Sequence, residues 1–477
     1  MRRLLPLVLT FALAACMVGP DHDDPRPGSP AQDPFLSGVS PAFTGDEPPG
    51  RWWNLFNDPL LDSLIEEALR ANTDLRVAAA NLRRARAVLR ETRSGLFPDF
   101  TASASATYSR QSGDQIGFPG SGGEGESYDV GIDMSYQLDL FGRIRRAIQA
   151  TRADADAAQA AFDVSRITVA AETARAYADA CSAGRQLAVA RETLCIQEQT
   201  FDLTRRLFEG GRVTALETGR AGALLEQVRA TVPTFEAQRS TALFRLSVLT
   251  GRPPAAFPRE VAACETAPAL DRPIPLGDGA ALLARRPDIR RTERELAAAT
   301  ARVGVATANL YPSVSLGGSV GSSATSLSGI GSSDSIRFSI GPLISFSLSN
   351  LSVGRARVAQ AEAGAEGALA TFEGTWLRAL EETESALTRY ARELDRLVAL
   401  RRGRAQSAEA ARIARLRYQA GRESFQIVLD TEREIANADA AVAQSEATLS
   451  DNLVALFLAL GGGWQDAPEV VRRPATS

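Results

Sequence analysis

The sequence predicts a mixed fold of long α-helices and membrane-type β-strands, built as a tandem duplication. Three observations lead to this prediction. Residues 127–140 alternate without error between apolar and polar side chains, with every apolar residue from Tyr128 to Leu140 at an even position. Residues 145–208 contain no proline, and a helix over them would be roughly 95 Å long. The motifs around both stretches recur roughly 210 residues later.

The N-terminus predicts export. Two arginines precede an apolar run over residues 4–15, which has the length of a signal peptide and is too short to cross a membrane as a helix. The run ends in Leu-Ala-Ala followed by Cys16, which resembles the lipobox of bacterial lipoproteins, in which the cysteine becomes the lipidated first residue. Met17 follows where an aspartate would signal retention in the inner membrane, so the outer membrane is favoured. A plain signal peptide with a chance cysteine is the alternative.

Composition excludes several classes of function. The net charge of −4 argues against nucleic-acid binding. After the signal peptide no stretch of 18 consecutive apolar residues follows, so a bundle of transmembrane helices is not expected. His22 is the single histidine, which excludes a His-based catalytic triad and a multi-His zinc site in the folded part. We therefore expect no enzyme and no cofactor other than a lipid on Cys16.

The remaining cysteines give no metal or disulfide pattern. Cys181, Cys195 and Cys264 lack CxxC spacing, so neither a metal site nor a disulfide framework is expected. Cys181 and Cys195 fall on one predicted helix about 21 Å apart, too far to bridge each other. We interpret all three as helix-packing residues.

The chain order follows from these patterns. Helical patterns start at Asp58-Pro59 and near residue 72, and a helix over 145–208 is followed by one over 213–249. The predicted segments are a signal peptide (1–15), a tether (16–50), a first repeat (51–251) with a β-hairpin (97–140) and a helical turn near residue 210, an irregular connector (252–285), a second repeat (286–461) with a β-hairpin (311–348) and a turn near residue 421, and a C-terminal tail (462–477).

The repeat is carried by short motifs at corresponding places. Leu96-Phe97-Pro98 recurs as Leu310-Tyr311-Pro312, before each hairpin. Phe208-Glu209-Gly210-Gly211-Arg212 recurs as Tyr418-Gln419-Ala420-Gly421-Arg422, between each pair of helices. Glycine there supplies the left-handed conformation of a tight turn. The chain is therefore read as helix, strand, loop, strand, long helix, turn and helix, twice over.

Four amphipathic strands cannot form a closed barrel, for which about eight are the minimum. Open edges with one apolar face cannot lie in lipid, so the barrel must be shared between chains, eight strands in a dimer or twelve in a trimer. The opposite face, with Asp129, Asp133 and Asp139, would line a water-filled conduit. A long strand of an ordinary β-sandwich is the alternative for residues 127–140 taken alone.

The sequence resembles the TolC-like outer membrane efflux proteins, in their lipoprotein (NodT-like) branch, over essentially the whole mature chain. The resemblance rests on a set of motifs: Cys16-Met-Val-Gly-Pro-Asp, Trp52-Trp53 with Phe56 and Asp58-Pro59-Leu60, Arg286-Pro287-Asp288-Ile289, Leu310-Tyr311-Pro312, and Tyr418 with Gly421. It implies a homotrimer with a 12-stranded β-barrel in the outer membrane, a 12-helix α-barrel in the periplasm, and an equatorial domain built from residues 252–285 and 462–477. It also implies two partners, a periplasmic adaptor and an inner-membrane RND-type transporter.

The resemblance also implies functional residues at the turns. Asp430 matches an acidic ring that narrows the periplasmic mouth, Arg433 lies three residues further on and can pair with it, and Arg220 stands at the corresponding position of the first repeat. Gln426 replaces the apolar residue that often forms a second constriction. Adaptor docking is expected at Gly211, Arg212, Thr214, Gly421, Arg422 and Ser424. The alternatives are a solvated Asp430 and turn residues without a partner.

Three functions are compatible with these features. The first is an outer membrane exit duct of a tripartite efflux pump for drugs or other small molecules, lipid-anchored and extending into the periplasm. The second is the exit duct of a type I protein secretion system. The third, a lipid-anchored periplasmic adaptor or coiled-coil stalk, leaves the four long strands unexplained. We therefore predict the efflux duct.

Overall fold

The structure, a computed structural model, describes residues 17–23, 25, 35–110, 124–270, 272–346, 351–465 and 467–471. The predicted signal peptide, Cys16 and the end of the C-terminal tail lie outside these residues. The chain divides into two compact units. Unit 1 comprises Met1–Pro25, Leu82–Ala158 and Arg291–Phe372, and unit 2 comprises Arg26–Asn81, Gln159–Arg290 and Glu373–Ser477.

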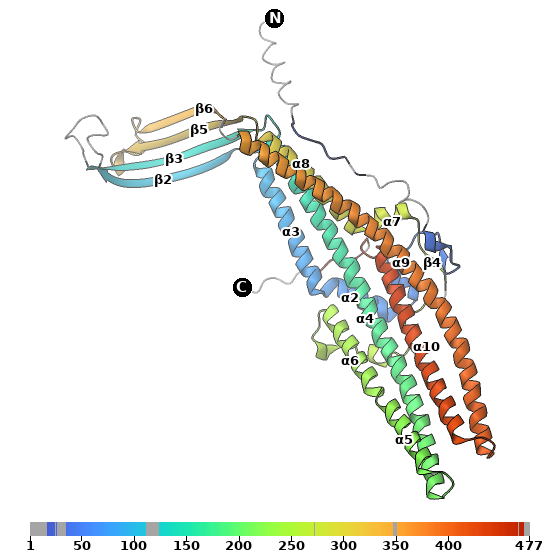
Figure 1. Cartoon of the computed structure of the whole chain (residues 1–477). Coiled ribbons are helices and arrows are strands. Elements are labelled where there is room, and N and C mark those ends of the chain that lie inside the picture. Colours follow the sequence, from blue (N-terminus) through green and yellow to red (C-terminus); the bar gives the residue numbers. More distant parts are fainter. Residues whose placement is uncertain are drawn as a thin grey trace. The chain divides into compact units, whose positions relative to one another are not determined.

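The chain is mostly helical and carries an internal repeat (Figure 1). Its helices are α2 (Pro59–Ala71), α3 (Thr73–Ser94), α4 (Arg143–Glu209), α5 (Ala215–Arg229), α6 (Val232–Leu249), α7 (Gly279–Arg285), α8 (Pro287–Ala308), α9 (Leu351–Gln419) and α10 (Phe425–Ala459). Its strands are β1 (Phe43–Thr44), β2 (Asp99–Arg110), β3 (Glu124–Leu138), β4 (Ile274–Pro275), β5 (Ser313–Ala324) and β6 (Ile336–Ser345). The order α3, β2, β3 and α4 recurs as α8, β5, β6 and α9. The pair α5 and α6 that follows in the first repeat corresponds to the single helix α10 in the second.

Unit 1 contains a four-stranded antiparallel sheet in the order β2-β3-β5-β6 (Figure 1). The register brings Ile132 opposite both Ala102 and Val320, and Val320 opposite Phe338. Residues directly opposite each other in an antiparallel sheet lie on the same face. The apolar sets of all four strands therefore share one face, on which Phe338 is 81% exposed within the chain.

The base of the sheet is fixed where β3 leads into α4. The carboxylate of Asp139 accepts the backbone N–H groups of Ile144 and Arg145, both at 2.9 Å, so it caps the otherwise unpaired first turn of α4. The ring of Phe141 stacks on that of Tyr311 with 4.6 Å between the centroids. One residue from each repeat thus meets at the sheet base, Phe141 after β3 and Tyr311 before β5.

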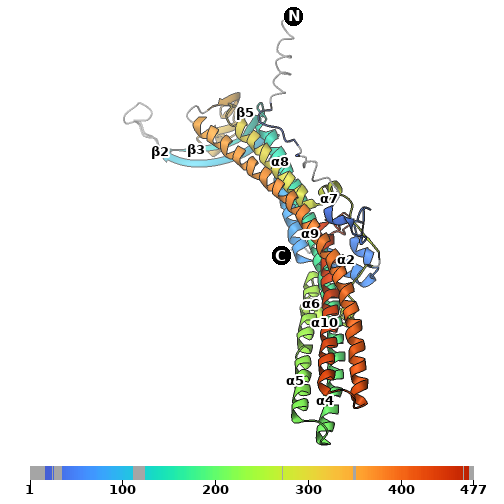
Figure 2. The ribbon, with the colours of Figure 1, turned by 45° about the vertical axis from the view of Figure 1, so that its right-hand side comes forward.

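In unit 2 the helices form two hairpins, α4 with α5 and α6, and α9 with α10 (Figure 2). The prediction of one helix over 213–249 is wrong, because α5 ends at Arg229 and α6 begins at Val232. Pro233 explains the break: it lacks a backbone N–H, and its ring would clash with the carbonyl of residue 229 in a continuous helix. Helix α10 of the second repeat contains no proline and is uninterrupted.

The segment predicted as a tether makes contacts of its own in unit 2. Glu384 of α9 accepts the backbone N–H groups of Leu36 (2.6 Å) and Ser37 (3.0 Å). Strand β1 pairs in parallel with β4, so this segment joins the connector. Further on, the indole of Trp52 stacks on Phe457 of α10 at 4.8 Å and is 1% exposed. The aromatic side chains of this stretch are therefore buried in unit 2: Phe35, Phe43, Trp52 and Trp53.

The connector is covalently attached to α4 by a disulfide between Cys181 and Cys264. Our interpretation of the three cysteines as packing residues is therefore wrong, because Cys181 and Cys264 are bonded to each other and Cys195 is free and exposed. The connector backbone at Cys264 lies directly against Gly184, one turn along α4, where a Cβ atom would overlap it. A bond that closes a loop of 83 residues restricts the unfolded chain strongly.

Removal of this disulfide should free the connector. We expect the double variant Cys181→Ser with Cys264→Ser to lose roughly 2–4 kcal/mol of stability, and trypsin to cleave it after Arg259 in the connector several-fold faster than wild type. Cys195→Ser is the matched control and should match wild type in the same digestion. Equal cleavage rates in all three proteins would show that the disulfide does not restrain the connector.

Candidate functional site

The turns that close the two helical hairpins have the same backbone geometry. Gly211 and Gly421 both have φ of +68°, the left-handed conformation predicted for them. In the first turn the N–H of Arg212 donates to the carbonyl of Leu207 at 2.8 Å, and the second repeats this bond at 2.9 Å from Arg422 to Arg417. This six-to-one bond beside a left-handed glycine is the Schellman motif, which ends a helix and reverses the chain. It leaves both arginines exposed at the tips of the hairpins.

The residues that start the returning helices differ between the repeats. Thr214 precedes α5, and its backbone N–H donates to Glu217 at 2.7 Å in a capping-box arrangement. Ser424 precedes α10 and makes no side-chain cap bond. Instead, the ring of Phe425 is 3% exposed and anchors the first turn of α10. One tip is held by capping and the other by packing.

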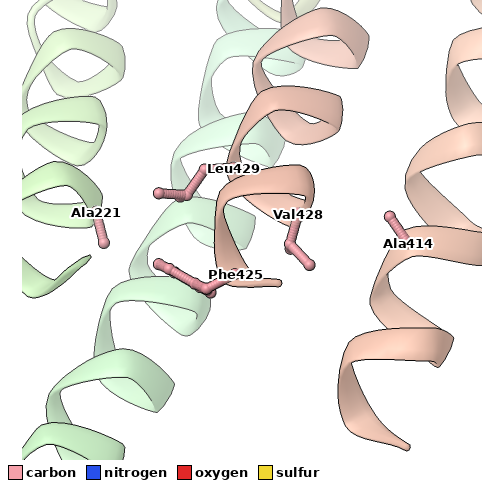
Figure 3. Close-up of a cluster of buried hydrophobic side chains, with 5 residues drawn as sticks. All are labelled: Ala221, Ala414, Phe425, Val428 and Leu429. Atoms are coloured by element: carbon pink, nitrogen blue, oxygen red, sulfur yellow. The ribbon is translucent and has the colours of Figure 1, made fainter. Parts of the chain in front are cut away.

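A buried apolar cluster holds the tips together (Figure 3). Figure 3 shows Val428 directed toward Ala414 of α9, and Phe425 and Leu429 on the side of α10 that faces Ala221 of α5. Phe201 of α4 and Tyr418 at the end of α9 pack against the same cluster, together with Leu224. All four helices of the tips therefore meet in one small core.

The three predicted gate residues lie on a solvent-accessible face of α10 next to the buried one. Asp430 accepts a hydrogen bond from Arg433 at 2.5 Å, and their side chains are 44% and 59% exposed. Gln426 accepts from Arg220 of α5 at 3.4 Å, so the first-repeat counterpart of Asp430 reaches the same surface. The spacing 426, 430, 433 places all three on one side of a helix. The surface combines one acid with two arginines and an amide.

Glu432 is a functional candidate that the sequence analysis missed. Its side chain is 2% exposed, accepts from Gln197 of α4 at 3.1 Å and lies 3.6 Å from the guanidinium of Arg415 of α9. Burial raises the pKa of the Glu432 carboxyl, against the opposing effects of Arg415 and the Gln197 hydrogen bond. The spacing of Phe425, Val428 and Glu432 was the available signal, because it places the acid on the buried face.

A pair of partly buried acids lines a cavity of about 730 Å³ between α4, α6 and α10. The side chains of Asp179 and Asp451 share a hydrogen bond there. Burial and then the charge of Asp451 raise the pKa of Asp179 to about 6, although Arg175 and Arg245 act in the opposite direction. The pair therefore shares one proton at mildly acidic pH.

This pair should make stability depend on pH. A carboxyl whose pKa is raised on folding stabilises the fold while it is protonated, and this contribution is lost as pH rises through about 6. The loss falls between the ordinary aspartate pKa of 3.8 and about 6. We expect Asp179→Asn to abolish it, so that its melting temperature exceeds that of wild type by a few degrees at pH 8 and by much less at pH 4. Asp202→Asn, half exposed on the same helix, is the control. A difference that does not change with pH would contradict the assignment.

Two features are absent from the part of the chain that the structure describes. No group of three or more His, Cys, Asp or Glu side chains is placed to hold a metal ion. Of the helices in the described ranges, none is both long and apolar enough to cross a membrane. Cys16, the predicted lipidation site, falls outside the described residues.

Comparison with known proteins identifies relatives along nearly the full length. The family model described as "outer membrane efflux protein" matches residues 64–252 and 280–462. Nodulation protein T of Rhizobium leguminosarum bv. trifolii is 29% identical, over 95% of this chain and 96% of its own. The probable outer membrane lipoprotein SilC of Salmonella typhimurium is 29% identical, over 97% and 99%. The solved outer-membrane channel OprN is 39% identical, with a TM-score of 0.90 over 94% of this chain and all of its own.

Proposed function

Since this chain belongs to the outer membrane efflux protein family, we propose that it forms the exit duct of a tripartite pump, passing small molecules from an inner-membrane transporter to the exterior. The chain is an outer membrane protein that extends into the periplasm. The relatives compared are named as channel, lipoprotein and nodulation protein, and none of these printed names states an enzymatic activity.

The single observation that carries the proposal is the register of the four-stranded sheet. It gathers the apolar side chains of all four strands on one face. The other face carries polar groups that bond across strands, such as Asp129 with Ser323 and Arg337, and Ser319 with Ser339 at 2.8 Å. A sheet with one apolar and one polar face suits a barrel wall between lipid and water.

Within the described residues β2 and β6 each pair with one strand, so each leaves an open edge. Unpaired edges are not tolerated in hydrocarbon. If β2 of one copy pairs with β6 of the next around a cyclic axis, the free backbone N–H and C=O groups of both edge strands become hydrogen-bonded. We propose the homotrimer that the family resemblance implies, with a 12-stranded barrel continued by a tunnel of twelve helices and an equatorial domain from residues 252–285 and 462–477.

The periplasmic gate is proposed at the exposed face of α10, with Asp430, Arg433 and Gln426. Three copies of Asp430 around a symmetry axis would repel one another and attract cations. Arg433 on the same helix balances part of that charge, and Gln426 is held toward Arg220. Because none of these side chains belongs to the buried cluster, they can be replaced without removing the packing of the tip.

Single-channel conductance in planar bilayers tests the duct and its gate. Wild type should show a small cation-selective conductance, and Asp430→Ala with Arg433→Ala should increase it several-fold by removing the charged constriction. The matched control is Arg392→Ala with Asp395→Ala, another exposed pair three residues apart on α9. Equal, wide conductance of all proteins would place the gate elsewhere. Absence of any conductance would contradict the duct and favour the anchored-stalk alternative.

Docking of a periplasmic adaptor is proposed at the two tips, through Gly211, Arg212 and Thr214 of the first turn and Gly421, Arg422 and Ser424 of the second. The support is their identical Schellman geometry, which presents an arginine at the same position of each turn. A partner could therefore bind both turns in the same manner despite their different sequences. An RND-type transporter would be the inner-membrane component.

Charge reversal at the tips should separate docking from conduction. We expect the double variant Arg212→Glu with Arg422→Glu to conduct like wild type in bilayers. In a strain that lacks the gene, however, it should fail to restore growth on the compounds to which the deletion makes the strain sensitive. Arg402→Glu, an exposed reversal on α9 away from the turn, should restore growth. Full rescue by the double variant would show that these arginines do not contribute to assembly.

A covalent lipid on Cys16 is also proposed, on the basis of the lipobox-like sequence and the printed lipoprotein name of SilC. No other cofactor is expected. The family covers the channel architecture but leaves the transported cargo open, so an exit duct for type I protein secretion remains the second candidate.

A further inference from the structure

The residues that directly follow Cys16 are bound to unit 1 by one buried arginine. The side chain of Arg146 on α4 is 3% exposed. Its guanidinium donates to the carbonyls of Val18 (3.1 Å) and Gly19 (3.0 Å) and to the carboxylate of Asp21 (2.8 Å). Its fourth acceptor is Gln149 on its own helix at 3.0 Å. Buried charges need partners inside the protein, and residues 18–21 supply three of the four.

Three glycines make room for this contact. A Cβ atom on Gly19, which has φ of +88°, would lie 2.5 Å from the Cα of Gly304 on α8. A Cβ atom on Gly304 would lie 2.7 Å from Cδ of Arg146. A Cβ atom on Gly142, with φ of +80°, would overlap the side chain of Met17. Each of these distances is too short for a Cβ atom. The contact therefore requires glycine both in the N-terminal segment, at residue 19, and in the elements it packs against, at residues 142 and 304.

The contact lies at the base of the β-sheet. The N–H of Val18 donates to the carbonyl of Phe141 at 3.4 Å, and Phe141 stacks on Tyr311. Tyr311 and Phe97 are 43% and 71% exposed within the chain. Aromatic residues at this level are typical of a membrane–water interface. Residues 17–23 therefore begin beside the level at which the sheet would enter the lipid.

We propose that residues 17–23 form a fixed strap, seated in a socket of Gly142, Arg146 and Gly304, which holds Met17, the start of the strap, at the interfacial base of the sheet. The role of the strap as the mount of a lipid rests on the proposed lipidation of Cys16, whereas its seating in the socket does not. The socket therefore sets the depth of the anchor relative to the barrel. A flexible N-terminal segment would instead allow the depth of the anchor relative to the barrel to vary.

Hydrogen exchange of the full-length protein in detergent, read by mass spectrometry on peptides covering residues 17–23, tests the strap. We expect Gly304→Ala to accelerate exchange of the Val18 amide, the strap N–H that donates to the carbonyl of Phe141, at least tenfold, because the added methyl group collides with Arg146 and displaces the strap. Alanine favours helix over glycine, so α8 itself should not be weakened. Gly364→Ala on α9, where the added methyl group meets no atom of the chain within 4 Å, is the matched control and should leave the exchange unchanged.

A second pair of variants tests the socket from the strap side. Asp21→Ala should accelerate exchange of the same peptides, whereas Asp23→Ala, two residues further on, should not. The protein should also be measured with Cys16→Ser and an ordinary cleavable signal peptide. Wild-type exchange as fast as that of a free peptide, or protection that disappears without the lipid, would overturn the strap. Conductance of the same samples separates this failure from a failure of the proposed duct.

Discussion

A backbone amide in hydrocarbon has no water to bond, and this constraint shapes the chain more than any single contact does. The sheet satisfies it internally along β3 and β5 but leaves β2 and β6 with one partner each. In the proposed barrel the remaining edges are paired by other copies, because an unpaired edge in lipid costs several kcal/mol for each group. The proposed oligomer thus follows from the two open edges of the sheet, while the number of copies depends on strand tilt and stagger.

Duplication explains why two surfaces of the same backbone geometry carry different chemistry. Both hairpin turns end in a Schellman motif with glycine at φ of +68° and an arginine next to it. The two repeats therefore share the backbone conformation of the turn, whereas the side chains of the helices that follow it differ. Arg220 of the first repeat stands where the second repeat has Asp430. Arg220 donates a hydrogen bond to Gln426, which lies one turn before Asp430 on α10, so residues of both repeats form one surface of mixed charge. A strictly symmetric pair would have placed like charges together.

Local patterns predicted the features that depend on local physics. Alternation predicted the strands, and glycine predicted both turns, because side-chain periodicity and left-handed φ are properties of short segments. The Cys181–Cys264 disulfide joins residues 83 positions apart, and spacing contains no information on such a contact. The seating of Gly19 against Gly304 is equally non-local. The break before Pro233 is different, since the proline was visible and its effect on the helix was overlooked.

The position of Glu432 suggests a role for a buried carboxyl group in the tip core, although its burial carries a desolvation penalty. Apolar contacts of Phe425, Val428 and Leu429 are non-directional, so they alone would tolerate a rotation of α10 that exposes other side chains. Glu432 bonds Gln197 of α4 and pairs with Arg415 of α9, and these directional contacts allow one orientation. A buried charged group contributes little net stability after desolvation, but it can specify register. The orientation it specifies is the one that leaves Gln426, Asp430 and Arg433 outside the tip core and accessible to solvent.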